Sequence, residues 1–123
     1  MSAKLAEPDK LCTNVTGDAA IGIVGMDRDR RQEQDRLLTI VFNNGVMAIE
    51  RGHMPYAIEM YDAMKQGGDY AQVAQALGSW GKRVEKVDDF LPSLQEAIAV
   101  TESGSPALLD CIVKEGYDFS KYP

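Results

Sequence analysis

The stretch "LLTIVFNNG", residues 37–45, decides the fold class of this chain. Its first six residues are mostly apolar and include three successive β-branched residues, which is typical of a strand buried on both faces of a parallel sheet. Asn43 and Asn44, followed by a glycine, end the apolar run abruptly. Because ligands of open α/β sheets bind at the carboxyl ends of the strands, this end of the run is a candidate binding site.

Strand and helix patterns alternate along the rest of the chain. We expect further strands at residues 11–16, 82–87 and 107–113, and helices at residues 56–65, 70–77 and 90–101. Asp69 is expected to cap the second of these helices and Gly78 to end it, while Asp88 or Asp89 is expected to cap the third. This alternation predicts an α/β fold, with three α/β/α layers around a mostly parallel sheet.

Length and composition indicate a single globular domain over residues 1–123, with 45% hydrophobic and 26% charged residues. A formal net charge of −6 argues against nucleic-acid binding and against a basic membrane-binding patch. No apolar run approaches the roughly 20 residues of a membrane-spanning helix, and the first residues lack the apolar core of a signal peptide, so we expect a cytoplasmic protein. Cys12 and Cys111 lie in expected strands without metal-ligand spacing and are predicted to be buried free thiols.

Two polar stretches follow expected strands, "TGDAAIG" at residues 16–22 and "NNG" at residues 43–45. A carboxylate at one strand end and an amide oxygen at a neighbouring end are hard oxygen ligands of the kind that Mg²⁺ prefers. Backbone N–H groups of a turn built from small residues can approach a diphosphate closely. Taken separately, each stretch is also an ordinary turn sequence. The order and separation of the two stretches make the prediction of a magnesium and diphosphate site stronger.

The order Gly-Asp-x, then some two dozen residues, then Asn-Asn at the end of an apolar strand resembles the diphosphate and magnesium motif of thiamine diphosphate enzymes. The resemblance extends to residues 3–27, 67–98 and 104–113, and therefore to nearly the whole chain. The most similar branch is the acetolactate synthase-like group with its decarboxylase and carboligase relatives. The resemblance implies that thiamine diphosphate and Mg²⁺ are the cofactors.

Site residues can be transferred to the matching positions one by one. The resemblance implies that the Asp18 carboxylate, the Asn44 side-chain oxygen and the Val46 backbone carbonyl would hold Mg²⁺. The other implied cofactor contacts are the backbone N–H groups of Gly17, Asp18, Ala19 and Ala20 at the diphosphate, Asn43 as support for its turn, and Met47 beside the cofactor.

Two further residues have a possible catalytic role. Glu50, in the pair Ile49-Glu50, matches a glutamate near the reacting centre of the pyruvate decarboxylase-like branch, although a solvated glutamate at the start of a helix is an equally good interpretation. His53, the only histidine, could transfer protons at neutral pH, but a histidine in a surface loop is the simpler interpretation.

The resemblance also implies a reaction and a partner. Enzymes of this family decarboxylate a 2-keto acid, and the product is protonated or joined to an acceptor, so a small 2-keto acid is the implied substrate. A pyrimidine-binding domain, usually in a partner subunit, supplies the activating glutamate, and this chain has no match to that domain. We therefore expect an incomplete unit that needs a partner chain and self-associates through exposed apolar surface. A non-catalytic α/β structural or interaction module and a flavodoxin-like binding domain remain as alternatives.

Two positions depart from the family pattern. Ala19 stands where the family has a glycine, which is costly if the turn needs a positive φ or a close backbone approach. Residues 28–36, "RDRRQEQDR", should form a helix but offer no apolar stripe to pack on a sheet. Permitted codons for residues 29–35, together with two bases before them and one base after them, encode Glu-Thr-Ala-Val-Arg-Asn-Arg-Ile in another frame. That peptide has the missing apolar positions, so we hypothesise a compensated frameshift or a sequencing error there.

Overall fold

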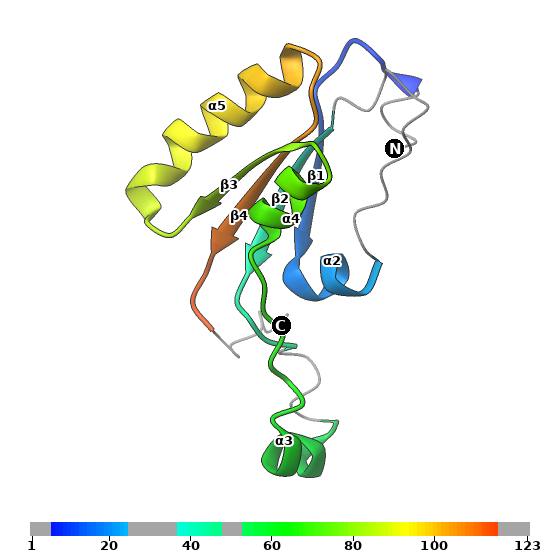
Figure 1. The fold of residues 1–123 in the computed structure, drawn as a ribbon, viewed down its shortest axis with the longest axis vertical. Helices are drawn as coiled ribbons and strands as arrows, with labels where there is room; N and C mark the ends of the chain where they lie inside the picture. Colours follow the sequence, from blue (N-terminus) through cyan, green and yellow to red (C-terminus); the bar gives the residue numbers. More distant parts are fainter. Residues whose placement is uncertain (1–5, 25–36, 48–52, 116–123) are drawn as a thin grey trace, which may run out of the picture.

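The computed structural model describes residues 6–24, 37–47 and 53–115, and all structural statements below concern these residues (Figure 1). Its elements are β1 (Cys12–Gly17), α2 (Asp18–Val24), β2 (Leu37–Asn43), α3 (Pro55–Tyr61), α4 (Tyr70–Ala76), β3 (Trp80–Val84), the short 3₁₀ helix η2 (Val87–Asp89), α5 (Phe90–Glu102) and β4 (Ala107–Ile112). The expectations for residues 28–36 and for Glu50 lie outside the described residues.

The four strands form one sheet in the order β1-β2-β4-β3, and every neighbouring pair is parallel. The last strand in the sequence, β4, therefore lies in the interior of the sheet, between β2 and β3. Because the strands are parallel, their carboxyl ends share one edge, which carries Gly17, Asn43 and Ile112 in adjacent positions. The predicted α/β fold with a parallel sheet is confirmed.

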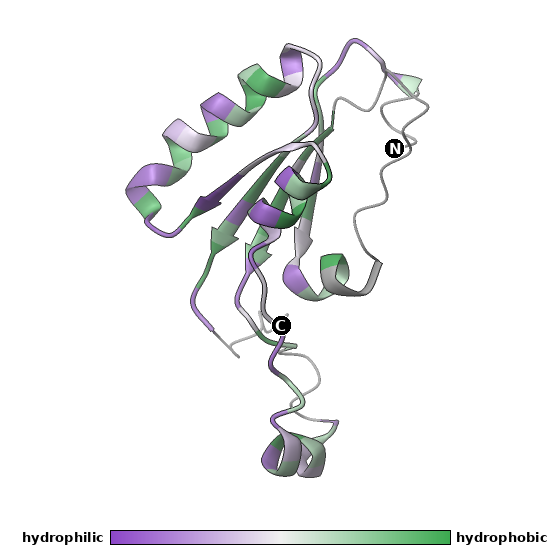
Figure 2. Cartoon of the chain, viewed as in Figure 1, coloured by the Kyte–Doolittle hydropathy of each residue, from purple (hydrophilic) through white to green (hydrophobic). Residues whose placement is uncertain are grey.

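Helices cover both faces of the sheet, which gives the three expected layers (Figure 1). Side chains alternate between the faces along each strand. We call the side covered by α5 the α5 face; its buried residues are Leu38, Ile40, Val84, Ala97, Ala107, Leu109 and Cys111. We call the other side the α4 face; its buried apolar residues are Val41, Tyr70, Ala74 and Leu108, with Ile21 of α2 packed against them. The interior strands β2 and β4 are largely apolar, whereas β3 carries hydrophilic residues and α5 alternates apolar and polar residues (Figure 2).

Helix α4 contacts β3 at very short range. A Cβ atom added to Gly81 of β3 would lie 2.3 Å from the backbone oxygen of Ala71 in α4, so only glycine permits this approach. The Asp69 carboxylate accepts a hydrogen bond of 2.9 Å from Gln72 N, and Gly78 follows the helix with a φ of 82°, which confirms the predicted cap and stop. Asp89 occupies the N-cap position of α5 but makes no capping hydrogen bond with its side chain.

Two predicted elements have bounds that differ from the structure by more than one residue. The third strand begins at Trp80 rather than residue 82, because Trp80 and Gly81 already pair with β4, and it ends at Val84 before η2. The helix expected over residues 56–65 ends at Tyr61, because Asp62 adopts the left-handed conformation with a φ of 51°. The chain then returns to the sheet through an isolated antiparallel bridge between Val46 and Lys65.

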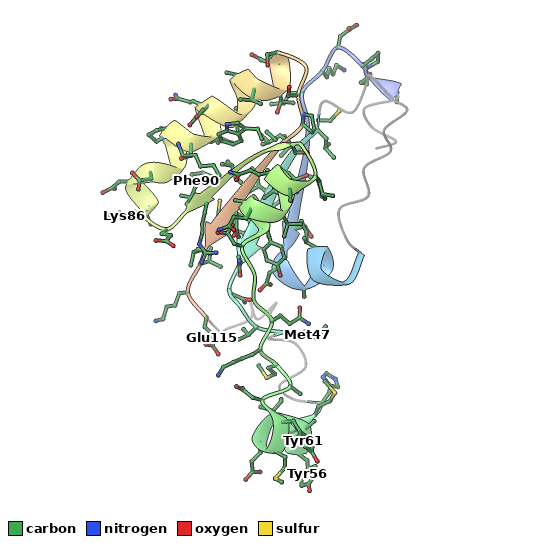
Figure 3. The ribbon with its side chains drawn as sticks, viewed as in Figure 1. Met47, Tyr56, Tyr61, Lys86, Phe90 and Glu115 are labelled. Carbon is green, nitrogen blue, oxygen red and sulfur yellow. The ribbon has the colours of Figure 1, made fainter. Side chains whose placement is uncertain are left out.

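Helix α3 lies at the end of this excursion, away from the sheet, and none of its residues is buried (Figure 1). Tyr56 and Tyr61 are 70% and 75% exposed and project from α3 at the far end of the molecule (Figure 3). No helix in the described ranges has the length and apolar character needed to cross a bilayer. Both cysteines are free, as predicted; Cys111 is buried, whereas Cys12 is only half-buried.

Candidate functional site

Asp18 connects the carboxyl ends of β1 and β2. It directly follows β1, begins α2, and is only 3% exposed. Its Oδ2 accepts a hydrogen bond of 2.8 Å from the backbone N of Gly45, and its Oδ1 accepts one of 2.9 Å from the backbone N of Ala19. The structure therefore brings together the two polar stretches that the sequence places at neighbouring strand ends.

The turn after β2 is shaped by its own asparagines. Asn43 Oδ1 accepts a bond of 3.2 Å from Gly45 N, which also donates to Asp18, and Asn44 Oδ1 accepts one of 3.1 Å from Val46 N. Gly45 has a φ of 73°, a conformation that glycine adopts without strain. Side-chain oxygens that accept from backbone N–H groups two residues later are typical of asparagine turns. The predicted supporting role of Asn43 agrees with this geometry.

Val46 and Met47 directly follow the turn in sequence, and Met47 is labelled in Figure 3. The bridge to the returning segment uses the Gly45 carbonyl, which accepts from Gln66 N, and the Met47 amide, which donates to Met64 O. The Val46 carbonyl takes no part in that bridge, although Val46 itself is only 7% exposed. Its proposed use as a ligand is therefore compatible with the observed pairing.

A second hydrogen-bonded group lies directly behind the turn, and the sequence reasoning missed it. Asp110 of β4 is fully buried; its Oδ1 accepts a bond of 2.9 Å from Asn43 Nδ2, and its Oδ2 accepts from Tyr70 N at 3.2 Å and from Arg83 Nη1 at 3.3 Å. The Tyr70 hydroxyl donates to the Asp18 carbonyl at 3.3 Å. The available signal was an aspartate within the apolar run "ALLDCIV", because a buried strand tolerates a carboxylate only when it is paired.

Burial sets the electrostatics of this group. Burial raises the pKa of Asp110 above its ordinary value, while the bonds from Asn43 and Tyr70 and the charge of Arg83 oppose that rise. Burial likewise raises the pKa of the Tyr70 hydroxyl, with smaller contributions from the Asp18 and Asp110 carboxylates. Tyr70 therefore acts as a hydrogen-bond donor at neutral pH.

The backbone conformation of Ala19 explains in part how an alanine can stand where the family has a glycine. Ala19 lies in the first turn of α2, and among the described residues Asp62 is the only non-glycine residue with a positive φ. The φ of Ala19 thus requires no glycine. Gly17 and Ala20 are exposed at the same edge of the sheet, and His53 is exposed in the turn before α3. Whether these residues contact a cofactor stays a prediction, as does the role of Glu50.

The donor set suits a hard cation. Within the described ranges, no three His, Cys, Asp or Glu residues form a group able to hold a metal, so a cation here would need amide and backbone oxygens beside one carboxylate. Carboxylate and amide oxygens each have two lone pairs. In the bonds given above, Asp18 Oδ1, Asp18 Oδ2 and Asn44 Oδ1 each accept one N–H, which leaves each oxygen a second lone pair for a cation. Oxygen ligands, few in number, fit Mg²⁺, which keeps several water or phosphate ligands when bound.

Comparison with known proteins identifies the family of this chain. The family described as "Thiamine pyrophosphate enzyme, C-terminal TPP binding domain" matches residues 1–111. The chain belongs to this family. This thiamine pyrophosphate (thiamine diphosphate) domain is 30% identical over 115 residues to the acetolactate synthase large subunit IlvG of Mycobacterium tuberculosis, with 91% of this chain and 20% of that protein covered. It is 26% identical over 120 residues to the putative thiamine pyrophosphate-containing protein YdaP of Bacillus subtilis, over 92% of this chain and 20% of the relative.

A solved structure shares the fold. The thiamine diphosphate-dependent 4-hydroxybenzoylformate decarboxylase of Rhodococcus jostii RHA1 superposes with a TM-score of 0.68 at 23% identity, over 96% of this chain and 22% of that one. The domain thus spans about a fifth of the length of the relatives it matches. The family match identifies a thiamine pyrophosphate-binding fold, and the predicted site residues, Asp18 and the Asn43–Asn44 pair, lie at the carboxyl edge of its sheet.

Proposed function

We propose that this domain binds thiamine diphosphate through Mg²⁺ as the cofactor-binding part of a 2-keto acid decarboxylase or carboligase similar to acetolactate synthase. The observation that carries the proposal is the Gly45 N–H, which bonds to both Asp18 Oδ2 and Asn43 Oδ1 and so unites the two motif stretches. Carboxyl edges of parallel sheets are the usual ligand sites of α/β folds.

In this proposal each residue has a defined task. Asp18, Asn44 and the Val46 carbonyl hold Mg²⁺, which neutralises the diphosphate. The backbone N–H groups of residues 17–20 face the diphosphate oxygens, and Met47 contributes an apolar contact. When bound, thiamine diphosphate supplies the electron sink for decarboxylation, while the protein supplies binding and orientation.

We also propose that the domain is incomplete as a catalyst. Its relatives are about five times longer, and the part of the family that this chain matches is the C-terminal thiamine pyrophosphate-binding domain. In enzymes of this family the activating glutamate comes from a separate pyrimidine-binding domain. The 2-keto acid substrate and a second chain or domain are therefore both needed for turnover. Exposed apolar side chains on α3, such as Met60 and Tyr61, support association with such a partner or with another copy.

Isothermal titration of the full chain with thiamine diphosphate, in Mg²⁺ and in chelator, tests the proposal. We expect binding only with Mg²⁺, and its loss in Asp18→Ala and in Asn44→Ala. The matched controls are Asn14→Ala on β1 and Asp88→Ala in η2, because both side chains are exposed and neither belongs to the proposed site. A folded wild-type chain that binds no cofactor would contradict the proposal and favour a non-catalytic module.

A further inference from the structure

We propose that Asp110 is a positioning residue for the Asn43–Val46 turn: it fixes the orientation of the Asn43 amide and thereby the position of the turn that the proposed Mg²⁺ site uses. The inference rests on the proposed function for the identity of the bound cation. The hydrogen bonds that position the turn are present in the chain without any cofactor. Asp110 lies on β4, 67 residues from Asn43 in sequence, and does not belong to the predicted motif.

The Asn43 amide has only one satisfactory orientation. Its Nδ2 donates to Asp110 Oδ1 at 2.9 Å and to the Gly68 carbonyl at 3.2 Å, so acceptors surround the nitrogen end. The oxygen end then faces Gly45 N at 3.2 Å. A flipped amide would place its oxygen against two acceptors and its NH₂ group against a donor. The Asp110 carboxylate is therefore the group that selects this orientation.

Asp110 is suited to this task because all its hydrogen-bond partners are donors. Besides Asn43, they are the Tyr70 amide and Arg83, its register partner on β3, whose side chain is 35% exposed and supplies the opposite charge. Only a carboxylate accepts from all three through its two oxygens. An asparagine at this position would turn an NH₂ group toward at least one of these donors.

The effect reaches the proposed Mg²⁺ ligands through Gly45. The Gly45 N–H is shared between Asn43 Oδ1 and Asp18 Oδ2, so a displaced Asn43 amide changes the bond that positions the Asp18 carboxylate. Tyr70 adds a second link, because its amide donates to Asp110 and its hydroxyl donates to the Asp18 carbonyl. Asp110 thus acts on the proposed site through Asn43 and Tyr70. None of its hydrogen bonds described above goes to a proposed Mg²⁺ ligand.

The test compares Asp110→Asn with Thr101→Val in the full chain. Thr101 is a matched control because it is also buried and loses one hydrogen bond, to the Ala97 carbonyl, but on α5 across the sheet. Amide hydrogen exchange at Gly45 is measured without cofactor and corrected for global stability. We expect Gly45 protection to fall about tenfold in Asp110→Asn, as for one lost hydrogen bond, and to stay unchanged in Thr101→Val. Equal Gly45 protection in the two variants would overturn the inference.

The second readout is the Mg²⁺ dependence of thiamine diphosphate binding. If wild type binds, Asp110→Asn should weaken the apparent Mg²⁺ affinity by about 10- to 100-fold, the usual effect of removing a group that orients a ligand, while Thr101→Val should not. Affinities that match the control would overturn the inference. If wild type binds nothing, the proposed function fails, and Gly45 exchange alone decides the positioning role.

A measurement on the wild type tests the inference even if the Asp110→Asn variant does not fold. The two Nδ2 protons of Asn43 should exchange slowly and show a nuclear Overhauser effect to Gly68, because both protons are bonded and buried. Rapid exchange of these side-chain protons, or a contact of the NH₂ group with the Gly45 amide instead, would overturn the inference.

Discussion

The two faces of the sheet are stabilised in different ways. The α5 face buries mainly apolar side chains of β2, β3, β4 and α5. The α4 face has a smaller apolar cluster, and at its carboxyl edge lie the buried carboxylate and amide side chains of the described residues, Asp18, Asn43 and Asp110. Packing on the first face depends on volume, whereas the second also depends on hydrogen-bond geometry. Stability and site geometry should therefore respond to different substitutions.

The largest expected effect is on the α5 face. Leu109 of β4 is fully buried there, so Leu109→Ala removes apolar contacts and leaves a cavity. We expect it to lower the free energy of unfolding by about 3 kcal/mol, measured by urea denaturation. Leu91→Ala on α5 is the control, because that side chain is 61% exposed and should change stability by less than about 0.5 kcal/mol. Equal effects of the two substitutions would show that Leu109 is not a core residue.

The next effect concerns the contact between α4 and β3. Gly81→Ala would place a Cβ 2.3 Å from the backbone oxygen of Ala71, so the helix must move away from the strand. We expect a loss of about 1 to 3 kcal/mol in thermal or urea unfolding, as for overpacked sites. Gly67→Ala, whose added Cβ meets no atom within 4 Å, is the control. A stable Gly81→Ala variant would contradict the close approach.

A smaller effect distinguishes the two helix caps. The Asp69 side chain caps α4, whereas the Asp89 side chain makes no capping bond to α5. Asp69→Ala should therefore lower the free energy of unfolding by about 1 kcal/mol, and Asp89→Ala should lower it by less. Urea titrations of both variants measure the difference. If Asp89→Ala proved the more damaging, the assignment of the caps would be wrong.

The last prediction is that the free energy of unfolding depends gradually on pH through Asp110, which lies on the α4 face. Asp110 is faced by Arg83 on β3, Asp69 before α4, and the polar groups of Asn43 and Tyr70. Because burial raises its folded pKa above the unfolded value, the native state retains this proton as pH rises, and the unfolded state releases it first. Its contribution to stability is thus greatest below the unfolded pKa and declines as pH rises through the folded pKa.

Wild type and Asp110→Asn should be compared by urea denaturation from acidic to neutral pH. The stability of wild type relative to the variant should decrease as pH rises across that window, because only wild type has the titrating group. A relative stability that increases with pH would mean that the paired donors, rather than burial, control the pKa of Asp110.

Sequence patterns predicted the fold because the two interior strands are nearly uniform apolar runs with clear ends. They also predicted that the polar stretches at residues 16–22 and 43–45 would lie at neighbouring strand ends, since the carboxyl ends of parallel strands share one edge. The helix at residues 56–65 was predicted too long because its apolar spacing continues past Asp62, where the backbone becomes left-handed. Apolar spacing carries no information about that conformation.

The hydrogen bonds around Asp110 could not be predicted from the sequence. They depend on the register of β4, in which Asp110 pairs with Val41 and so faces the same side as Asn43 two residues later. A shift of one residue would turn Asp110 toward the α5 face, and no local pattern distinguishes these registers. The partners Tyr70 and Arg83 come from two further elements whose positions follow only from the assembled sheet.

The interior position of β4 also has a consequence for the order of folding during synthesis. Until residues 107–112 leave the ribosome, β2 lacks its second neighbour and β3 has no strand to pair with in the observed sheet. The contacts that complete the sheet therefore join segments distant in sequence and form late, a topology that slows folding. At synthesis rates of about 5 to 20 residues per second, the β4-facing edge of the apolar strand β2 remains unpaired for seconds. An unpaired apolar strand edge favours aggregation, so the nascent domain is most prone to aggregate during this interval.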